Sequence, residues 1–210
     1  MNTTVIAAGI LLATAPGVFA GVTYDAQTRY VGAEAFTSTG NPSDQIDSVD
    51  FGVFDESIVR TFDDISVYAT QHSELNTSGI FASGTAFGSF GSSPGTAGIG
   101  HSYVEVAFTL SEATDFTLDF NANGNWGNYD LDLGAYSASG AFNTFSVYTP
   151  SGSLDAGSYS ILLDFGRDPF EDNGQFELEG DFSFELTFVP APSGAAMLGF
   201  GTLAATRRRR

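Results

Sequence analysis

Residues 176–188 constrain the fold more than any other part of the chain. Apolar residues or glycine occupy every second position from Phe176 to Phe188, and acidic or hydroxyl side chains occupy the positions between them. An alternation with a period of two places the apolar side chains on one face of a strand and the polar ones on the other. We therefore expect a half-buried antiparallel strand here, either continuous or divided in two by a bend at Gly180.

The same alternation recurs along the middle of the chain. Gly, Ser, Asn and Pro separate the alternating segments, and no amphipathic helical pattern lasts two turns. These features predict an all-β domain with eight to ten short strands, arranged as an antiparallel β-sandwich or a jelly-roll-like fold. The other expected strands are residues 22–30, 104–110, 116–120, 129–135 and 159–165, with 65–69 and 142–148 as less regular candidates.

Two segments are informative about local structure. Residues 81–100 are rich in Gly and Ser with scattered Phe, which fits either a mobile loop or a pair of small-residue strands. Residues 154–159 resemble the L-x-x-G-x-Y entry to a strand that is common in secreted β-sandwiches. For this segment we favour a turn at Gly157, followed by Tyr159 whose hydroxyl caps the loop.

Composition excludes several classes of chemistry. The 210-residue chain has no cysteine and no lysine, which excludes disulfides, thiol catalysis, cysteine-zinc sites and lysine Schiff bases. All 25 carboxylates lie between Asp25 and Glu185, where only Arg29, Arg60 and Arg167 oppose them. This body has 25 negative and three positive charges, a net charge of −22. Nucleic acid is therefore not expected as a partner, because binding phosphates requires Lys and Arg.

The first twenty residues indicate export. They contain no charged side chain, and an apolar run over residues 5–15 is broken by Pro16 and Gly17. Val18 and Ala20 then stand at the −3 and −1 positions before Gly21. This pattern predicts a secretory signal peptide over residues 1–20, cleaved between Ala20 and Gly21. The alternative is a buried first helix.

The last 22 residues contain a second targeting pattern. Pro190-Ala191-Pro192 precedes a short span rich in Gly, Ala and Leu, and the chain ends in four arginines. We expect this span to form a short hydrophobic helix. Crossing a bilayer takes about 20 residues, so we expect only a transient membrane insertion. Arginines that follow an apolar span stay cytoplasmic. The arginines of the terminal cluster are Arg207, Arg208, Arg209 and Arg210.

Residues 189–210 resemble a PEP-CTERM protein-sorting signal, with alanine at Ala191 where the family usually has glutamate. The resemblance implies recognition and cleavage by an exosortase, an integral membrane protease of bacteria that typically make exopolysaccharide. It also implies a client protein of the cell surface or extracellular matrix. The alternative is a single-pass tail anchor. The expected organisation is thus a signal peptide at 1–20, a β-sandwich domain at 21–188 and a sorting signal at 189–210.

The sequence contains little that indicates a catalytic site. The two histidines, His72 and His101, lie in polar surroundings, and no G-x-S-x-G elbow is present. Glu177, Glu179 and Asp181 share one face of the expected strand, but such an outer face is normally solvated. We therefore expect a protein that is not an enzyme, with a secreted glycoside hydrolase as the alternative.

One segment fits a calcium-loop template. Residues 119–124 match D-x-[DN]-x-[DN]-G, with oxygen ligands expected from Asp119, Asn121, Asn123 and, at position twelve, Asp130. No other cofactor is expected. The alternative is an Asn/Gly-rich hairpin connection between two strands.

Trp126 lies in the same segment and, with Tyr129 and Tyr136 nearby, is a candidate for stacking on a sugar ring. Local packing of these aromatic rings is the alternative. The sequence as a whole predicts an exported, structural or adhesive surface protein in contact with polysaccharide. The alternative function is a carbohydrate-binding module, assisted by calcium. Divalent cations would have to bridge the −22 body to any anionic polymer.

Overall fold

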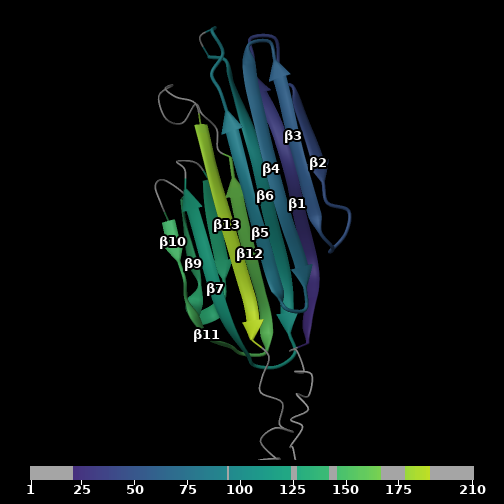
Figure 1. Cartoon of the computed structure of the whole chain (residues 1–210), viewed down its shortest axis with the longest axis vertical. Helices are drawn as coiled ribbons and strands as arrows, with labels where there is room; N and C mark the ends of the chain where they lie inside the picture. The colour runs from purple at the N-terminus through teal and green to yellow at the C-terminus, as the bar shows by residue number, and fades with distance from the viewer. Residues whose placement is uncertain (1–20, 94, 124–126, 142–145, 167–177, 190–210) are drawn as a thin grey trace, which may run out of the picture.

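The chain folds into two antiparallel β-sheets packed face to face, as Figure 1 shows. The computed structural model describes residues 21–93, 95–123, 127–141, 146–166 and 178–189. The six-stranded sheet has the order β2 (Ser43–Asp47), β1 (Val22–Phe36), β6 (Ala97–Leu110), β12 (Gly157–Phe165), β8 (Gly127–Asp132) and β9 (Ala138–Ala141). The seven-stranded sheet has the order β10 (Ser146–Tyr148), β7 (Thr114–Asn123), β13 (Leu178–Val189), β5 (Gly79–Gly88), β4 (Ile65–Asn76) and β3 (Phe54–Phe62), while β11 (Ser151–Leu154) pairs with β7. A short 3-10 helix spans Gly134–Tyr136.

The described part of the alternating segment, from Leu178 onward, lies in β13, a single strand in the middle of the seven-stranded sheet. It pairs with β5 on one side and β7 on the other. Phe182, Phe184, Leu186 and Phe188 are buried, whereas Asp181 and Glu185 are exposed. The predicted half-buried strand is confirmed, and Gly180 continues it without dividing it.

The predicted sandwich is confirmed, but the expected number and length of its strands are wrong. Thirteen strands occur among the described residues, and β1 and β6 contain 15 and 14 residues. Neither β2 nor β3 was expected from the sequence. Within the described ranges, no helix has the length and apolar character needed to span a bilayer.

The interior consists of two apolar clusters separated by polar side chains. The larger cluster is rich in phenylalanine and lies between β6, β7, β12 and β13. The smaller one is built from aliphatic residues and Phe54 on β1, β3 and β4. Between them lies a polar seam, which we define as Arg29, Gln71, Ser73 and Ser102, all almost fully buried.

Glycines let the two sheets approach closely at two positions. A Cβ added to Gly100 on β6 would overlap the carbonyl oxygen of Tyr68 on β4, in the opposite sheet. A Cβ on Gly88 of β5 would overlap the carbonyl oxygen of Gly98 on β6 in the same way. Residues 81–100 contain most of β5 and the start of β6, which lie in opposite sheets, so this segment holds two small-residue strands.

The first and last described strands meet at one end of the sandwich. Val22 pairs with Leu110 and Val189 pairs with Asp115, the residues on either side of the turn that joins β6 to β7. In Figure 1, β1 begins and β13 ends at the lower end of the molecule. Both outer segments of the chain are therefore attached to the same end of the body.

Candidate functional site

Most of the predicted processing residues lie outside the described part of the chain. These are Ala20, Pro190, Ala191, Pro192 and the arginines from Arg207 to Arg210. Gly21, the expected first residue after cleavage, is exposed, and its carbonyl oxygen accepts a hydrogen bond from the Ser111 amide (3.1 Å). The expected start of the mature chain is therefore bonded to the β6–β7 turn.

The structure does not bring the four candidate calcium ligands together. Asp119, Asn121 and Asn123 lie at alternate positions of β7, on the outer face of the seven-stranded sheet. Asp130 lies on β8, on the outer face of the six-stranded sheet. The core separates these faces, because Phe120 of β7 and Tyr129 of β8 meet inside it at a ring distance of 5.1 Å. Residues 119–123 thus form a strand, and the described positions of these four residues do not form the expected loop.

The structure describes two of the three aromatic residues of this candidate sugar site. Trp126 itself lies outside the described residues. Tyr129 packs edge-on against Phe120, and Tyr136 packs edge-on against Phe116 with ring centroids 5.0 Å apart. For these two tyrosines, the local-packing alternative is confirmed.

The predicted turn before β12 is confirmed. The Tyr159 hydroxyl donates a hydrogen bond to the Asp155 carbonyl oxygen (2.7 Å), so it caps the turn between β11 and β12. Burial raises the pKa of this hydroxyl first, and the nearby Asp155 and Asp132 charges raise it further. The tyrosine therefore remains neutral and serves as a structural hydrogen-bond donor.

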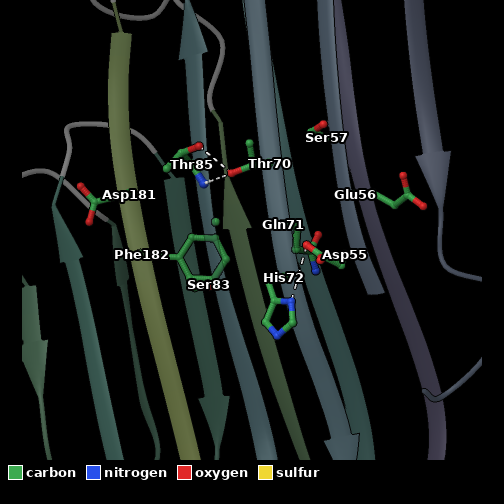
Figure 2. Close-up of a pocket in the computed structure, with 11 residues that line it drawn as sticks. Asp55, Glu56, Ser57, Thr70, Gln71, His72, Ser83, Thr85, Asp181 and Phe182 are labelled. Carbon is green, nitrogen blue, oxygen red and sulfur yellow. Dashed lines mark hydrogen bonds and ion pairs between the residues drawn. The ribbon is translucent and has the colours of Figure 1, made fainter. Parts of the chain in front are cut away.

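A shallow groove of about 530 Å³ lies on the outer face of the seven-stranded sheet, where Figure 2 shows its side chains. Cross-strand pairing builds it from two rows. The first row contains Asp55, His72 and Ser83 on β3, β4 and β5, and the second contains Ser57, Thr70, Thr85 and Asp181 on β3, β4, β5 and β13. We call this the hydroxyl groove.

Hydrogen bonds and stacked rings hold the hydroxyl groove in shape. The Thr70 and Thr85 hydroxyls are 2.7 Å apart, and the Thr85 amide also donates to the Thr70 hydroxyl (3.3 Å). Beside them, Tyr68 on β4 stacks on Phe87 on β5 with ring centroids 5.1 Å apart. The groove therefore offers hydroxyls and a carboxylate on a rigid sheet, next to an aromatic pair.

Asp55, His72 and Ser83 have the residue types of a catalytic triad, although nothing in their sequence spacing pairs them. His72 Nδ1 lies 3.5 Å from Asp55 Oδ1, and both side chains are more than half exposed. No hydrogen bond joins His72 to Ser83 among the described residues. A nucleophile needs a base within hydrogen-bond reach and donors for an oxyanion, whereas strand amides in the middle of a sheet are paired in the ladder. This geometry suits hydrogen bonding to a ligand better than acyl transfer.

The other histidine belongs to the outer face of the six-stranded sheet. His101 is partly buried beside Tyr30, Glu34 and Gln45. Burial lowers the pKa of its imidazole, which keeps the ring neutral near pH 7.

Carboxylates dominate this second outer face. Tyr30 and Tyr103 stack with ring centroids 4.9 Å apart, and Tyr103 donates to Glu105 (3.2 Å). Burial, together with the Glu105 charge, raises the pKa of Tyr103 to about 12. Burial also raises the pKa of Asp164. A face of this kind repels anionic polymers.

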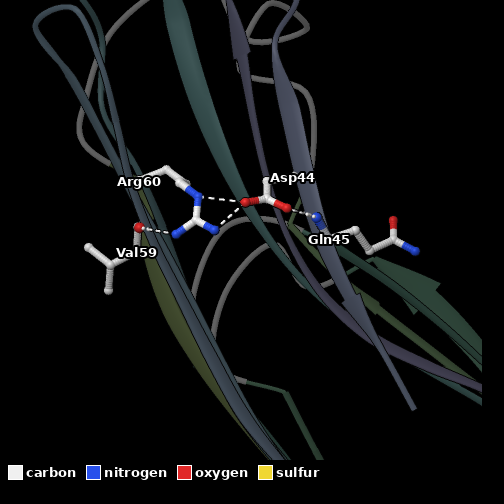
Figure 3. A network of polar contacts seen from close by, with 4 residues as sticks. All are labelled: Asp44, Gln45, Val59 and Arg60. Carbon is white, nitrogen blue, oxygen red and sulfur yellow. Dashed lines mark hydrogen bonds and ion pairs between the residues drawn. The ribbon is translucent and has the colours of Figure 1, made fainter. Parts of the chain in front are cut away.

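An ion pair joins the two sheets at one edge of the sandwich, as Figure 3 shows. Arg60 on β3 donates through Nε (2.6 Å) and through Nη2 to the same oxygen of Asp44 on β2. Arg60 Nη1 donates to the Val59 carbonyl oxygen (2.8 Å).

Within the described ranges, no three His, Asp or Glu side chains converge in a group that could hold a metal ion. Neither a family model nor a curated protein sequence matches the chain.

Proposed function

We propose that the chain is an exported, non-catalytic protein of the cell surface or extracellular matrix, sorted by an exosortase-type membrane protease. The proposal combines the signal-peptide pattern of residues 1–20 with the Pro-x-Pro motif, short apolar span and arginine cluster of residues 189–210. The structural observation that carries it is the attachment of β1 and β13 at one end of a rigid sandwich. A body held there by its C-terminal segment projects all of its other surfaces away from the membrane.

Mass spectrometry of the surface protein in a host that carries an exosortase tests this proposal. Mature material is expected to begin at Gly21 and to lack Arg207 to Arg210. A Pro190→Ala/Pro192→Ala variant is the matched control, and it is expected to remain in the membrane fraction with its C-terminus intact. Mature surface protein that still carries the four arginines would contradict exosortase processing.

Neutral-polysaccharide binding is the second candidate function, and the hydroxyl groove favours it. Hydroxyls and carboxylates hydrogen-bond sugar hydroxyls, and the adjacent Tyr68–Phe87 pair adds apolar surface. The carboxylates on both outer faces disfavour an anionic polymer. The ligand class supported by these residues is therefore a neutral glycan.

Affinity electrophoresis in gels with a neutral glucan or with an anionic uronate polymer tests this function. The glucan is expected to retard the wild-type protein, and Thr85→Val is expected to reduce the retardation because it removes one hydroxyl at nearly constant volume. Thr28→Val is the control, because Thr28 is exposed on the six-stranded sheet. Equal retardation of both variants, or retardation only by the uronate polymer, would exclude the groove as a neutral-glycan site.

A further inference from the structure

The edge of the seven-stranded sheet formed by β3 differs from the other sheet edges of the described chain. The strands at those other edges are short: β2 has five residues, β9 and β11 have four, and β10 has three. In contrast, β3 has nine residues without Pro or Gly, and it is hydrogen-bonded to β4 on one side only. Proteins usually shorten or cover an edge strand, because its unpaired N–H and C=O groups can pair with another chain.

Exposed apolar side chains collect beside this strand. Val59 lies on β3 and is 69% exposed, and Val49, Phe51 and Val53 lie in the segment that leads into β3, with Val49 95% exposed. These are four of the six large apolar side chains that are exposed in the described chain. Such a concentration on one edge is typical of an interaction surface.

The segment that carries these apolar residues is held firmly. The buried Arg29 guanidinium donates through Nη2 to the Asp50 carbonyl oxygen (2.6 Å) and to the Ser48 hydroxyl (3.0 Å). Phe51 stacks on Tyr24 with ring centroids 6.4 Å apart. The apolar side chains are therefore presented from an ordered backbone.

The open side of β3 can be assigned from the Arg60 contacts. Arg60 Nη1 bonds the Val59 carbonyl oxygen while the same guanidinium reaches Asp44 on β2, which indicates that this carbonyl points away from β4. Because strand residues alternate in the direction of their backbone groups, Ser57 and Thr61 present theirs to the same open side.

The charges of β3 are self-complementary. When two copies of an antiparallel strand pair about a two-fold axis at Ile58, Arg60 of each copy lies opposite Glu56 of the other. Ser57 then lies opposite Val59, and Phe54 opposite Phe62. Glu56 forms no ion pair with any residue that the structure describes, so its charge is available to this contact. Arg60 exchanges its bonds to Asp44 and to the Val59 carbonyl oxygen for this contact when the strands pair.

We propose that β3 is a self-association strand, which pairs antiparallel with β3 of a second copy of this chain in the register centred on Ile58. The pairing joins two seven-stranded sheets into one continuous sheet, and it covers part of the apolar surface around Val59. Two bodies that each carry a charge of −22 repel one another at low salt. Association is therefore expected to strengthen as the ionic strength rises to about 0.15 M, where the screening length falls to about 8 Å.

Charge reversal at β3 tests this register by sedimentation velocity on the mature chain. Wild-type protein is expected to dimerise reversibly with concentration. Glu56→Arg alone sets like charges opposite Arg60, and Arg60→Glu alone sets like charges opposite Glu56, so each is expected to weaken the dimer roughly tenfold or more. An equimolar mixture of the two variants restores opposite charges at both contacts and is expected to recover a heterodimer. Circular dichroism confirms that each variant is folded before it is compared.

Disulfide cross-linking provides a second readout, which does not depend on those charges. The chain has no cysteine, so single substitutions give a clean background. A mixture of Ser57→Cys and Val59→Cys is expected to cross-link on mild oxidation, because the two cysteines lie opposite each other. Val59→Cys alone is the control, because in this register its two copies do not lie opposite each other. Wild-type protein that stays monomeric at every concentration and salt, or a mixture of charge variants that stays monomeric, would overturn the proposal. Cross-linking that is as efficient for Val59→Cys alone would overturn the register. None of these three results would affect the sorting proposal.

Discussion

The buried Arg29 provides the sharpest test of how the sandwich is held together. Its side chain is 1% exposed, and among the described residues no carboxylate lies within hydrogen-bonding distance of it. Instead it donates five hydrogen bonds to neutral acceptors, which are Gln27 Oε1, the Ser73 carbonyl and hydroxyl oxygens, the Ser48 hydroxyl and the Asp50 carbonyl oxygen. Burial lowers the pKa of Arg29, and the Asp50 charge partly offsets this shift. The guanidinium thus joins β1, β4 and the segment before β3.

The expected cost of Arg29→Met follows from these contacts. Methionine retains most of the apolar stem but none of the donors, and each buried polar group left without a partner costs about 1–3 kcal/mol. Relief of the desolvated charge offsets part of that cost. We expect a net loss of about 3 kcal/mol in the free energy of unfolding. For a domain of this size, that loss lowers the melting temperature by roughly 6–12 °C.

Urea and thermal unfolding followed by circular dichroism measure this loss, and hydrogen exchange locates it. Amides of residues 48–53 are expected to exchange faster in Arg29→Met, because their backbone loses its anchor. Arg60→Met at low protein concentration is the matched control. It removes a partly exposed ion pair, which is typically worth less than about 1 kcal/mol. A change in Arg29→Met no larger than that in Arg60→Met would refute the role assigned to the buried guanidinium.

Three further predictions concern packing, pH and the turn before β12. Gly100→Ala is expected to destabilise by about 3 kcal/mol or more, because its Cβ would overlap a carbonyl oxygen of the opposite sheet, whereas Gly157→Ala has space and is expected to be neutral in urea titrations. Burial lowers the pKa of His101 below 6.5, so stability is expected to fall as the pH drops through 6.5. The fall in the urea midpoint from about pH 7.5 to about pH 5.5 should be smaller in His101→Gln, and an identical fall would remove His101 as its cause. Tyr159→Phe is expected to cost about 0.5–1 kcal/mol through its lost turn hydrogen bond, and an unchanged melting curve would show that the bond adds nothing.

The fold was predictable wherever one face of a strand is uniformly apolar. β13 met that condition, with Phe182, Phe184, Leu186 and Phe188 all turned inward. β3 did not meet it, because Glu56 and Arg60 lie on the same face of this edge strand as the buried Ile58. The alternation that predicts a central strand is therefore absent from this edge strand.

The candidate sites were less predictable, because they depend on partners far apart in the sequence. Arg29 is stabilised by groups near residues 48–50 and at Ser73, and spacing alone does not reveal such contacts. The calcium template was misleading for a local reason. Leu118, Phe120 and Ala122 continue a strand alternation through it, and this was the signal that residues 119–123 lie in a sheet.

The shared location of Val22 and Val189 also decides how the fold responds to mechanical force. Tension between these two points acts across one end of the sandwich, so it loads the inter-strand hydrogen bonds one after another, as a zipper opens. It does not shear many of them at once. A body tethered through one strand alone stands outside the line of force, so it stays folded when its surroundings are stretched.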